Sequence, residues 1–76
     1  MPKLKQFADC RISIYPRDHH PPRVHVEFRD GDRCTVEIGS LKVAGFVRPA
    51  SKLGKALAWI ESHRVTLMET WKEIVR

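Results

Sequence analysis

Alternation of apolar and polar residues dominates the first half of the chain. It covers three runs, at residues 10–14, 23–28 and 33–38, each with an apolar residue at every second position. A period of two is typical of β-strands that are buried on one face only. We therefore expect strands at these three places, and a further strand that ends the sheet near Val47.

Two tight turns are predicted to connect the later strands. Asp30-Gly31 is a hairpin signal, and a three-residue loop over residues 30–32 with a bulge keeps the apolar residues of both strands on one face. Gly39-Ser40 suits a two-residue type II′ turn. The expected pairs are Phe28 with Cys34, Val26 with Val36, His25 with Glu37, Ile38 with Leu41, and Val36 with Val43.

The apolar spacing becomes helical after Pro49, which has no amide hydrogen and is tolerated in a first helical turn. Apolar residues recur over 53–60 and again over 65–75, and the polar stretch at residues 62–64 predicts a break between two helices. Periodicity alone also allows one long helix. We predict a single α+β domain over residues 1–76, a small antiparallel β-meander of three to four strands with one face covered by two C-terminal helices.

Composition narrows the class of protein. The chain has 76 residues, no apolar run long enough to cross a bilayer and no signal-peptide pattern near Met1, so a cytoplasmic address without membrane contact is expected. Cys10 and Cys34 have no CxxC spacing, and we expect both to be reduced.

The net charge is +5, and it is concentrated in the second half of the chain. Residues 39–76 hold seven Lys and Arg against three Glu, whereas residues 1–38 hold seven against six acids. A basic excess favours nucleic acid or an acidic protein as partner, and a solvated surface is the alternative. Arg48, Lys52 and Lys55 are expected on one helix face. The candidate nucleic-acid-binding residues are Arg11, Arg23, Arg29, Arg33, Lys42, Arg48, Lys52 and Lys55.

Histidines cluster around Pro21-Pro22, in the segment 18–26. The prolines favour extended geometry in the residue before each of them, so His20 is expected to be held extended beside the following strand. His20 and His25, with Arg23 between them, have the chemistry for metal-free RNA cleavage, namely a base, an acid and a cation for the phosphate. These three are the candidate catalytic residues.

Two other interpretations of this cluster stay open. Asp18, His19, His20 and His25 are possible metal ligands, but their spacing matches no zinc signature and the cysteines point to the opposite face, so no metal and no other cofactor is expected. In a purely structural role, His25 pairs across the strands with Glu37, which is ordinary sheet chemistry.

The segment His-His-Pro-Pro-Arg-Val-His-Val-Glu-Phe and the later run from Trp59 to Trp71 resemble the small bacterial proteins grouped as domain of unknown function 4160. The family loop reads His-Pro-Pro-His-Val-His, and Arg23 stands here in place of its middle histidine. Arg23 binds anions but does not shuttle protons. The resemblance implies this fold and a gene pair of toxin–antitoxin type, with a cognate small protein from a neighbouring gene.

Two functional hypotheses follow. In the first, the chain is a toxin–antitoxin-type protein that engages nucleic acid, RNA rather than DNA. Weak metal-independent RNase activity is compatible with this hypothesis, so whether the chain is an enzyme stays open. In the second, it is a non-catalytic binding module, either a DNA-binding regulator or a phage-type inhibitor that acts by protein–protein contact. A homodimer is compatible with both.

Overall fold

A computed structural model describes residues 3–18 and 20–75. Five strands form one antiparallel sheet in which each strand pairs with its neighbours in sequence. They are β1 (Lys3–Gln6), β2 (Cys10–Ser13), β3 (Arg23–Phe28), β4 (Arg33–Glu37) and β5 (Val43–Phe46). The predicted α+β meander is confirmed, with one strand more than the predicted three to four.

The additional strand is β1, at one edge of the sheet. Its sequence Lys-Leu-Lys-Gln contains one apolar residue and therefore shows no alternation. It pairs antiparallel with β2, and the register shifts between Lys3 and Lys5. Because β1 contributes only Leu4 to the packing against the core, its place in the sheet depends on backbone pairing that the apolar pattern does not reveal.

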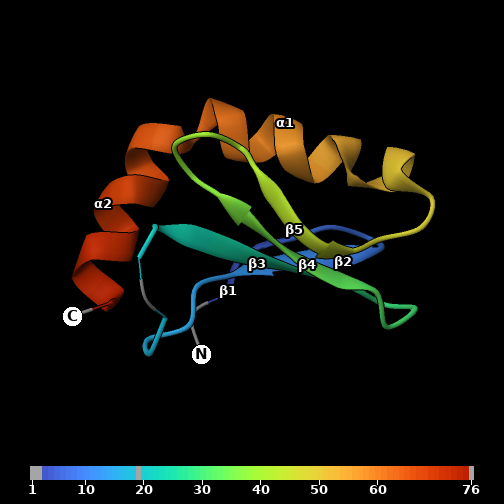
Figure 1. Cartoon of the computed structure of the whole chain (residues 1–76), viewed down its shortest axis with the longest axis horizontal. Coiled ribbons are helices and arrows are strands. Elements are labelled where there is room, and N and C mark those ends of the chain that lie inside the picture. The colour runs from blue at the N-terminus through green and yellow to red at the C-terminus, as the bar shows by residue number, and fades with distance from the viewer. Residues whose placement is uncertain (1–2, 19, 76) are drawn as a thin grey trace.

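The C-terminal part forms a short 3-10 helix, η1 (Ala50–Leu53), followed by α1 (Gly54–Ser62) and α2 (Arg64–Ile74). The predicted break is confirmed, because His63 lies between the two α-helices with φ −113° and ψ 20°. Figure 1 shows both α-helices on one side of the sheet, with α2 turning down past one end of the strands. No helix in the described part of the chain is long and apolar enough to cross a membrane.

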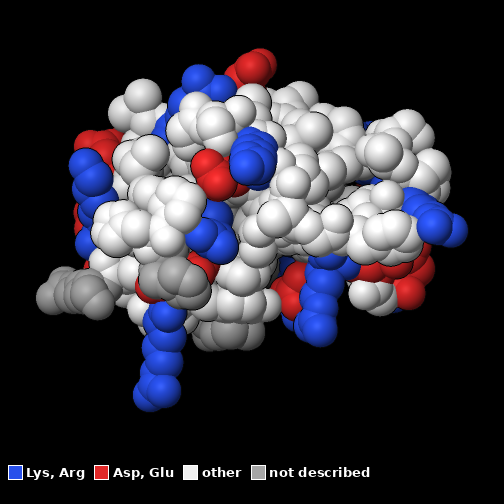
Figure 2. All heavy atoms as spheres, viewed as in Figure 1, with Lys and Arg blue, Asp and Glu red and all other residues white. Residues whose placement is uncertain are grey.

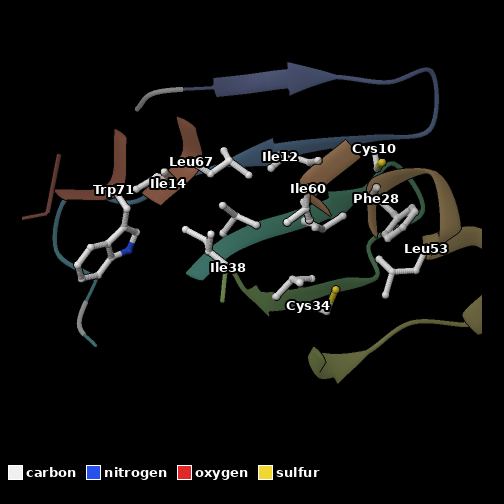
Figure 3. Packing of buried hydrophobic residues seen from close by; sticks show 14 residues of the cluster. Cys10, Ile12, Ile14, Phe28, Cys34, Ile38, Leu53, Ile60, Leu67 and Trp71 are labelled. Carbon is white, nitrogen blue, oxygen red and sulfur yellow. The ribbon is translucent and has the colours of Figure 1, made fainter. Parts of the chain in front are cut away.

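The core lies between the sheet and these helices. Its buried residues come from alternate positions of β2, β3 and β4 and from the inner sides of η1, α1 and α2. Figure 3 shows Trp71 at one end of the cluster near Ile14, and Leu53 at the other end near Phe28. The alternation in the first half of the chain thus marks the residues that pack on the helices.

The hairpin between β3 and β4 has the predicted loop length but begins one residue earlier. The Phe28 amide donates to the Asp32 carbonyl (2.8 Å), so the loop is residues 29–31. Gly31 has φ +100°, and it occupies the left-handed third position that such a loop requires. The predicted loop would have placed Asp32 at that position.

The register of β3 against β4 therefore differs from the prediction by two residues. His25 lies opposite Thr35, and Glu37 lies opposite Arg23. A shift of two residues leaves every side chain on its predicted face, but it exchanges the pairing partners. The predicted pairing of His25 with Glu37 is wrong.

The turn between β4 and β5 is longer than the predicted type II′ turn. The Glu37 amide donates to the Lys42 carbonyl (2.9 Å), which leaves residues 38–41 in the loop, and Leu41 has the positive φ of 63°. Val36 pairs with Val43 as expected. Ile38 is fully buried and donates its amide to the Pro22 carbonyl (3.0 Å), so it anchors the loop to the core instead of pairing with Leu41.

Candidate nucleic-acid interface

The face of the sheet that points away from the helices is called the open face here. It carries the polar positions of the alternating strands, together with Tyr15 after β2 and Phe46 of β5. Two shallow hollows of about 410 Å³ each lie along it, and both are lined by Glu27 and Arg33. In Figure 2 basic side chains project from the side away from α1, with acidic side chains beside them, and other basic groups are spread over the rest of the visible surface.

A short row of charges crosses the middle of the open face. Glu27 of β3 lies between Arg11 of β2 and Arg33 of β4, which are its direct neighbours on either side. Arg11 Nε lies 3.2 Å from Glu27 Oε1, and the Arg11 side chain is half exposed. One glutamate thus faces two arginines, which leaves positive charge in excess at the place where the two hollows meet.

An exposed aromatic ring lies at the end of this row. Phe46 of β5 is directly opposite Arg33, and 62% of its surface is exposed. The Arg48 guanidinium carbon lies 4.5 Å from the centre of the Phe46 ring. Phe46 therefore projects from the sheet beside two arginines, which is the combination of π-surface and charge that stacks a base and holds its phosphate.

The other end of the open face holds a histidine in a fixed setting. His25 Nε2 lies 2.9 Å from Asp18 Oδ2, and the Asp18 side chain is only 8% exposed. The Tyr15 ring packs on the His25 ring with centroids 4.1 Å apart. Burial, together with a hydrogen bond and the negative charge of Glu27, raises the pKa of the Tyr15 phenol. Asp18 and Tyr15 thus hold one orientation of the His25 ring.

The three candidate catalytic residues have different contacts. His20 packs edge-on against Trp71 of α2, with ring centroids 4.9 Å apart, so it lies toward the helices. His25 projects from the open face, since its neighbours Val24 and Val26 are buried against the helices. Arg23 Nε donates to the Pro21 carbonyl (3.1 Å) and lies opposite Glu37. The His20–Pro21 peptide bond is cis.

The remaining basic candidates have different surroundings. Lys42 and Lys55 are exposed, Lys42 just before β5 and Lys55 on α1. Arg29 Nη1 lies 3.5 Å from the Ala8 carbonyl oxygen. Lys52 is tied down between Asp30 (2.6 Å) and Asp32 (2.9 Å), with its ammonium over the Phe28 ring.

The predicted single helix face of Arg48, Lys52 and Lys55 is wrong. Arg48 precedes Pro49 and the first helical residue, Lys52 belongs to η1, and Lys55 belongs to α1. The chain changes direction at Pro49, so Arg48 turns to Phe46 and the open face instead. Only Lys55 of the three remains as an exposed helical cation.

Within the described residues, no group of three or more His, Cys, Asp or Glu is arranged to hold a metal ion. His19, one of the possible ligands, lies outside the described residues. Cys10 and Cys34 are free and buried on the helix side. Burial, with a smaller effect of Asp9, raises the pKa of the Cys10 thiol to about 11, and burial also raises the pKa of Cys34. Neither thiol is poised as a nucleophile.

Sequence reasoning did not place Tyr15 or Phe46 in the candidate site, and it named Asp18 only as a possible metal ligand. The alternation that places Arg11 and Ser13 on this face extends to Tyr15, which therefore had a signal in the sequence. The position of Phe46 also had a signal in the sequence, because the predicted pairing of Val36 with Val43 sets Phe46 opposite Arg33. The hydrogen bond of Asp18 to His25 had no such signal, because it depends on the path of the loop between β2 and β3.

A family model described as Domain of unknown function (DUF4160) matches residues 10–72, well over half of the chain. No curated protein and no solved structure gave a match.

Proposed function

This chain belongs to the family described as Domain of unknown function (DUF4160), and we propose that it binds nucleic acid on the open face of its sheet, single-stranded RNA in preference to duplex DNA. The observation that carries the proposal is the exposed Phe46 ring, directly opposite Arg33 and in contact with Arg48. An exposed aromatic side chain flanked by arginines binds unpaired bases by stacking and their phosphates by charge.

The preference for single strands follows from the chemistry of this surface. Bases in a duplex are stacked on one another, so an aromatic ring on a flat sheet reaches them only where the strand is unpaired. Arg11 and Arg33 lie along the two hollows of the open face, where the phosphates of an extended strand would pass. The proposed path therefore runs across the strands from Phe46 toward Tyr15 and His25.

Cleavage is a separate part of the proposal, and it rests on His25. Asp18 Oδ2 accepts a hydrogen bond from His25 Nε2, and this arrangement orients an imidazole for proton transfer. His20 contacts Trp71 of α2, whereas His25 contacts Asp18 and Tyr15, so the acid–base role is assigned to His25 alone. We propose binding as the main activity, and weak metal-independent cleavage only if His25 acts without His20.

Fluorescence anisotropy with a labelled 12-nucleotide RNA tests the binding proposal. The RNA and the same sequence as duplex DNA are titrated with the chain at two salt concentrations. The proposal predicts tighter binding to the RNA and an affinity that falls steeply as salt rises, because bound counterions are released. Equal affinity for both ligands, or an affinity that is independent of salt, contradicts it.

Cleavage and the toxin–antitoxin setting need an experiment of their own. The setting rests on the family resemblance, so the chain is expressed alone and together with the product of the neighbouring gene, and growth is scored. His25→Ala separates the two activities in the same assay. If cleavage causes toxicity, His25→Ala relieves it while RNA binding persists; if binding causes it, His25→Ala has little effect.

A further inference from the structure

The two edges of the sheet differ in how they meet solvent. β1, at one edge, has an irregular register and carries the exposed Lys5. Bulges and lysines of this kind protect an edge strand from pairing with another chain. β5, at the other edge, has the sequence Val-Ala-Gly-Phe, with no charge and no proline, and all four residues are exposed. It lacks both protections.

The β5 edge also presents apolar surface. Three large apolar side chains are exposed in the described part of the chain, and two of them, Val43 and Phe46, belong to this four-residue strand. Val43 is 40% exposed, on the side of the strand nearer the helices. A strand with free backbone groups and exposed apolar side chains is a template for the addition of another strand.

The backbone groups that point outward follow from the contacts with β4. The Lys42 carbonyl accepts the Glu37 amide, and the Ala44 carbonyl accepts the Thr35 hydroxyl, so both carbonyls point toward β4. In a planar trans peptide the next N–H points the opposite way. The amides of Val43 and Gly45 are therefore directed to the open edge.

The charges at the two ends of β5 select the kind of strand. Lys42 and Arg48 are both exposed and bracket the strand, six residues apart, or roughly 20 Å along an extended chain. In the antiparallel pairing of two copies that sets Gly45 opposite Gly45, Lys42 of one copy approaches Arg48 of the other at both ends. Like charges at such positions are unfavourable, which argues against a second copy and for acidic residues on the added strand.

We propose that β5 binds an extended segment of a partner protein as a sixth strand, and that this segment carries acidic residues six positions apart opposite Lys42 and Arg48. Main-chain hydrogen bonds to the Val43 and Gly45 amides supply affinity, and the two charge pairs supply specificity. The segment alternates, with its acidic residues on the open-face side and apolar residues beside Val43. This inference does not depend on RNA binding.

A capped synthetic peptide, Glu-Val-Thr-Val-Thr-Val-Glu, is the probe. It is titrated into the isotope-labelled chain and followed by amide NMR. The proposal predicts shifts confined to β5 and its flanks and slower hydrogen exchange at the Val43 and Gly45 amides. It also predicts about tenfold weaker binding of the matching peptide with lysine at both ends. No binding, shifts centred on β1 or the helices, or equal binding of both peptides overturns the proposal.

Two variants sharpen the test. Val43→Pro removes the outward amide without removing a hydrogen bond to β4, and it is expected to weaken binding of the peptide about tenfold. Val43→Thr keeps the amide and is expected to keep the affinity for the peptide. The double variant Lys42→Glu/Arg48→Glu keeps the backbone and is expected to reverse the preference toward the lysine peptide. Its matched control, Lys55→Glu/Lys72→Glu, changes the total charge equally and is expected to retain the original preference.

The outcomes of these variants are decisive in either direction. Undiminished peptide binding by Val43→Pro contradicts edge pairing, and an unchanged preference in Lys42→Glu/Arg48→Glu contradicts the acidic partner even if Val43→Pro does not fold. Light scattering of the chain without peptide tests whether a second copy of the chain occupies the β5 edge. A dimer with the Val43 and Gly45 amides already protected assigns the edge to a second copy and overturns the proposal.

Discussion

Asp18 and His25 are joined by a hydrogen bond of 2.9 Å between Oδ2 and Nε2, which ties the segment before β3 to that strand. The Asp18 side chain is nearly buried, so its partners satisfy a group that would otherwise lose water without compensation. This contact fixes both the loop and the imidazole on the open face.

Removal of the Asp18 carboxylate is therefore expected to destabilise the chain. Asp18→Ala should cost about 1–3 kcal/mol in the free energy of unfolding, since the His25 ring loses its partner. Asp18→Asn keeps an acceptor oxygen and should cost less. Urea denaturation followed by tryptophan fluorescence measures both variants. If Asp18→Ala unfolds at the wild-type urea concentration, the contact does not hold the loop.

Lys52 links the β3–β4 loop to η1, and its loss is expected to change the response to acid. Hydrogen bonds from Lys52 lower the pKa of Asp30, and a backbone hydrogen bond from Arg48 together with Lys52 lowers the pKa of Asp32. A carboxyl with a lowered pKa stabilises the folded state above its unfolded value of 3.8, and this contribution is lost as the pH falls through the folded pKa.

Lys52→Met is accordingly expected to be less stable than wild type at pH 7 and to lose less stability below pH 3.8. The methionine keeps the packing on Phe28 but not the charge. Urea denaturation at a series of pH values measures the difference, with the exposed Lys55→Met as control. Parallel curves for wild type and Lys52→Met would show that the two carboxyls do not depend on Lys52.

Gly45 brings β5 close to β4, and no other residue is expected to fit there. It has φ +117°, and an added Cβ would lie 2.8 Å from the Cys34 Cα. Gly45→Ala should therefore cost about 1–3 kcal/mol in the free energy of unfolding. Gly39→Ala is the matched control, since a Cβ there meets nothing within 4 Å and φ is not in the left-handed region. Equal stability of the two variants would contradict the close approach.

Charge on the open face is expected to set the salt dependence of RNA binding. Arg33→Ala should reduce the slope of log affinity against log salt by about 0.7, the value for one lost phosphate contact on a single strand. Lys55→Ala removes the same charge from the helical layer and should leave the slope unchanged. A larger change for Lys55→Ala would move the binding surface from the sheet to the helices.

Much of the fold could be predicted because burial follows the sequence pattern directly. Ile12, Val26 and Val36 are fully buried at the alternate positions that predicted them, and the polar stretch around His63 ends α1 as expected. The exact pairings could not be predicted, since a register shift of two residues keeps every face unchanged. The difference was decided by Gly31, which alone suits the left-handed position of the loop.

The site was predictable only in part, because its contacts depend on the paths of loops. Arg11 and Arg33 were placed on the open face by alternation alone. The contact of His20 with Trp71 could not be inferred, because Trp71 lies fifty-one residues further along the chain. Proximity in sequence grouped two histidines whose ring contacts differ, since His20 packs on Trp71 and His25 on Tyr15.

The most direct test of nucleic-acid binding on the open face is the affinity of Phe46→Ala for the labelled single-stranded RNA. Val65→Ala is the matched control, because Val65 is 75% exposed on α2, away from the sheet. We expect Phe46→Ala to lose about 1–3 kcal/mol of binding free energy, with stability unchanged, Val65→Ala to bind like wild type and Phe46→Trp to retain binding. If Phe46→Ala binds the RNA as tightly as Val65→Ala, the open face is not the binding surface.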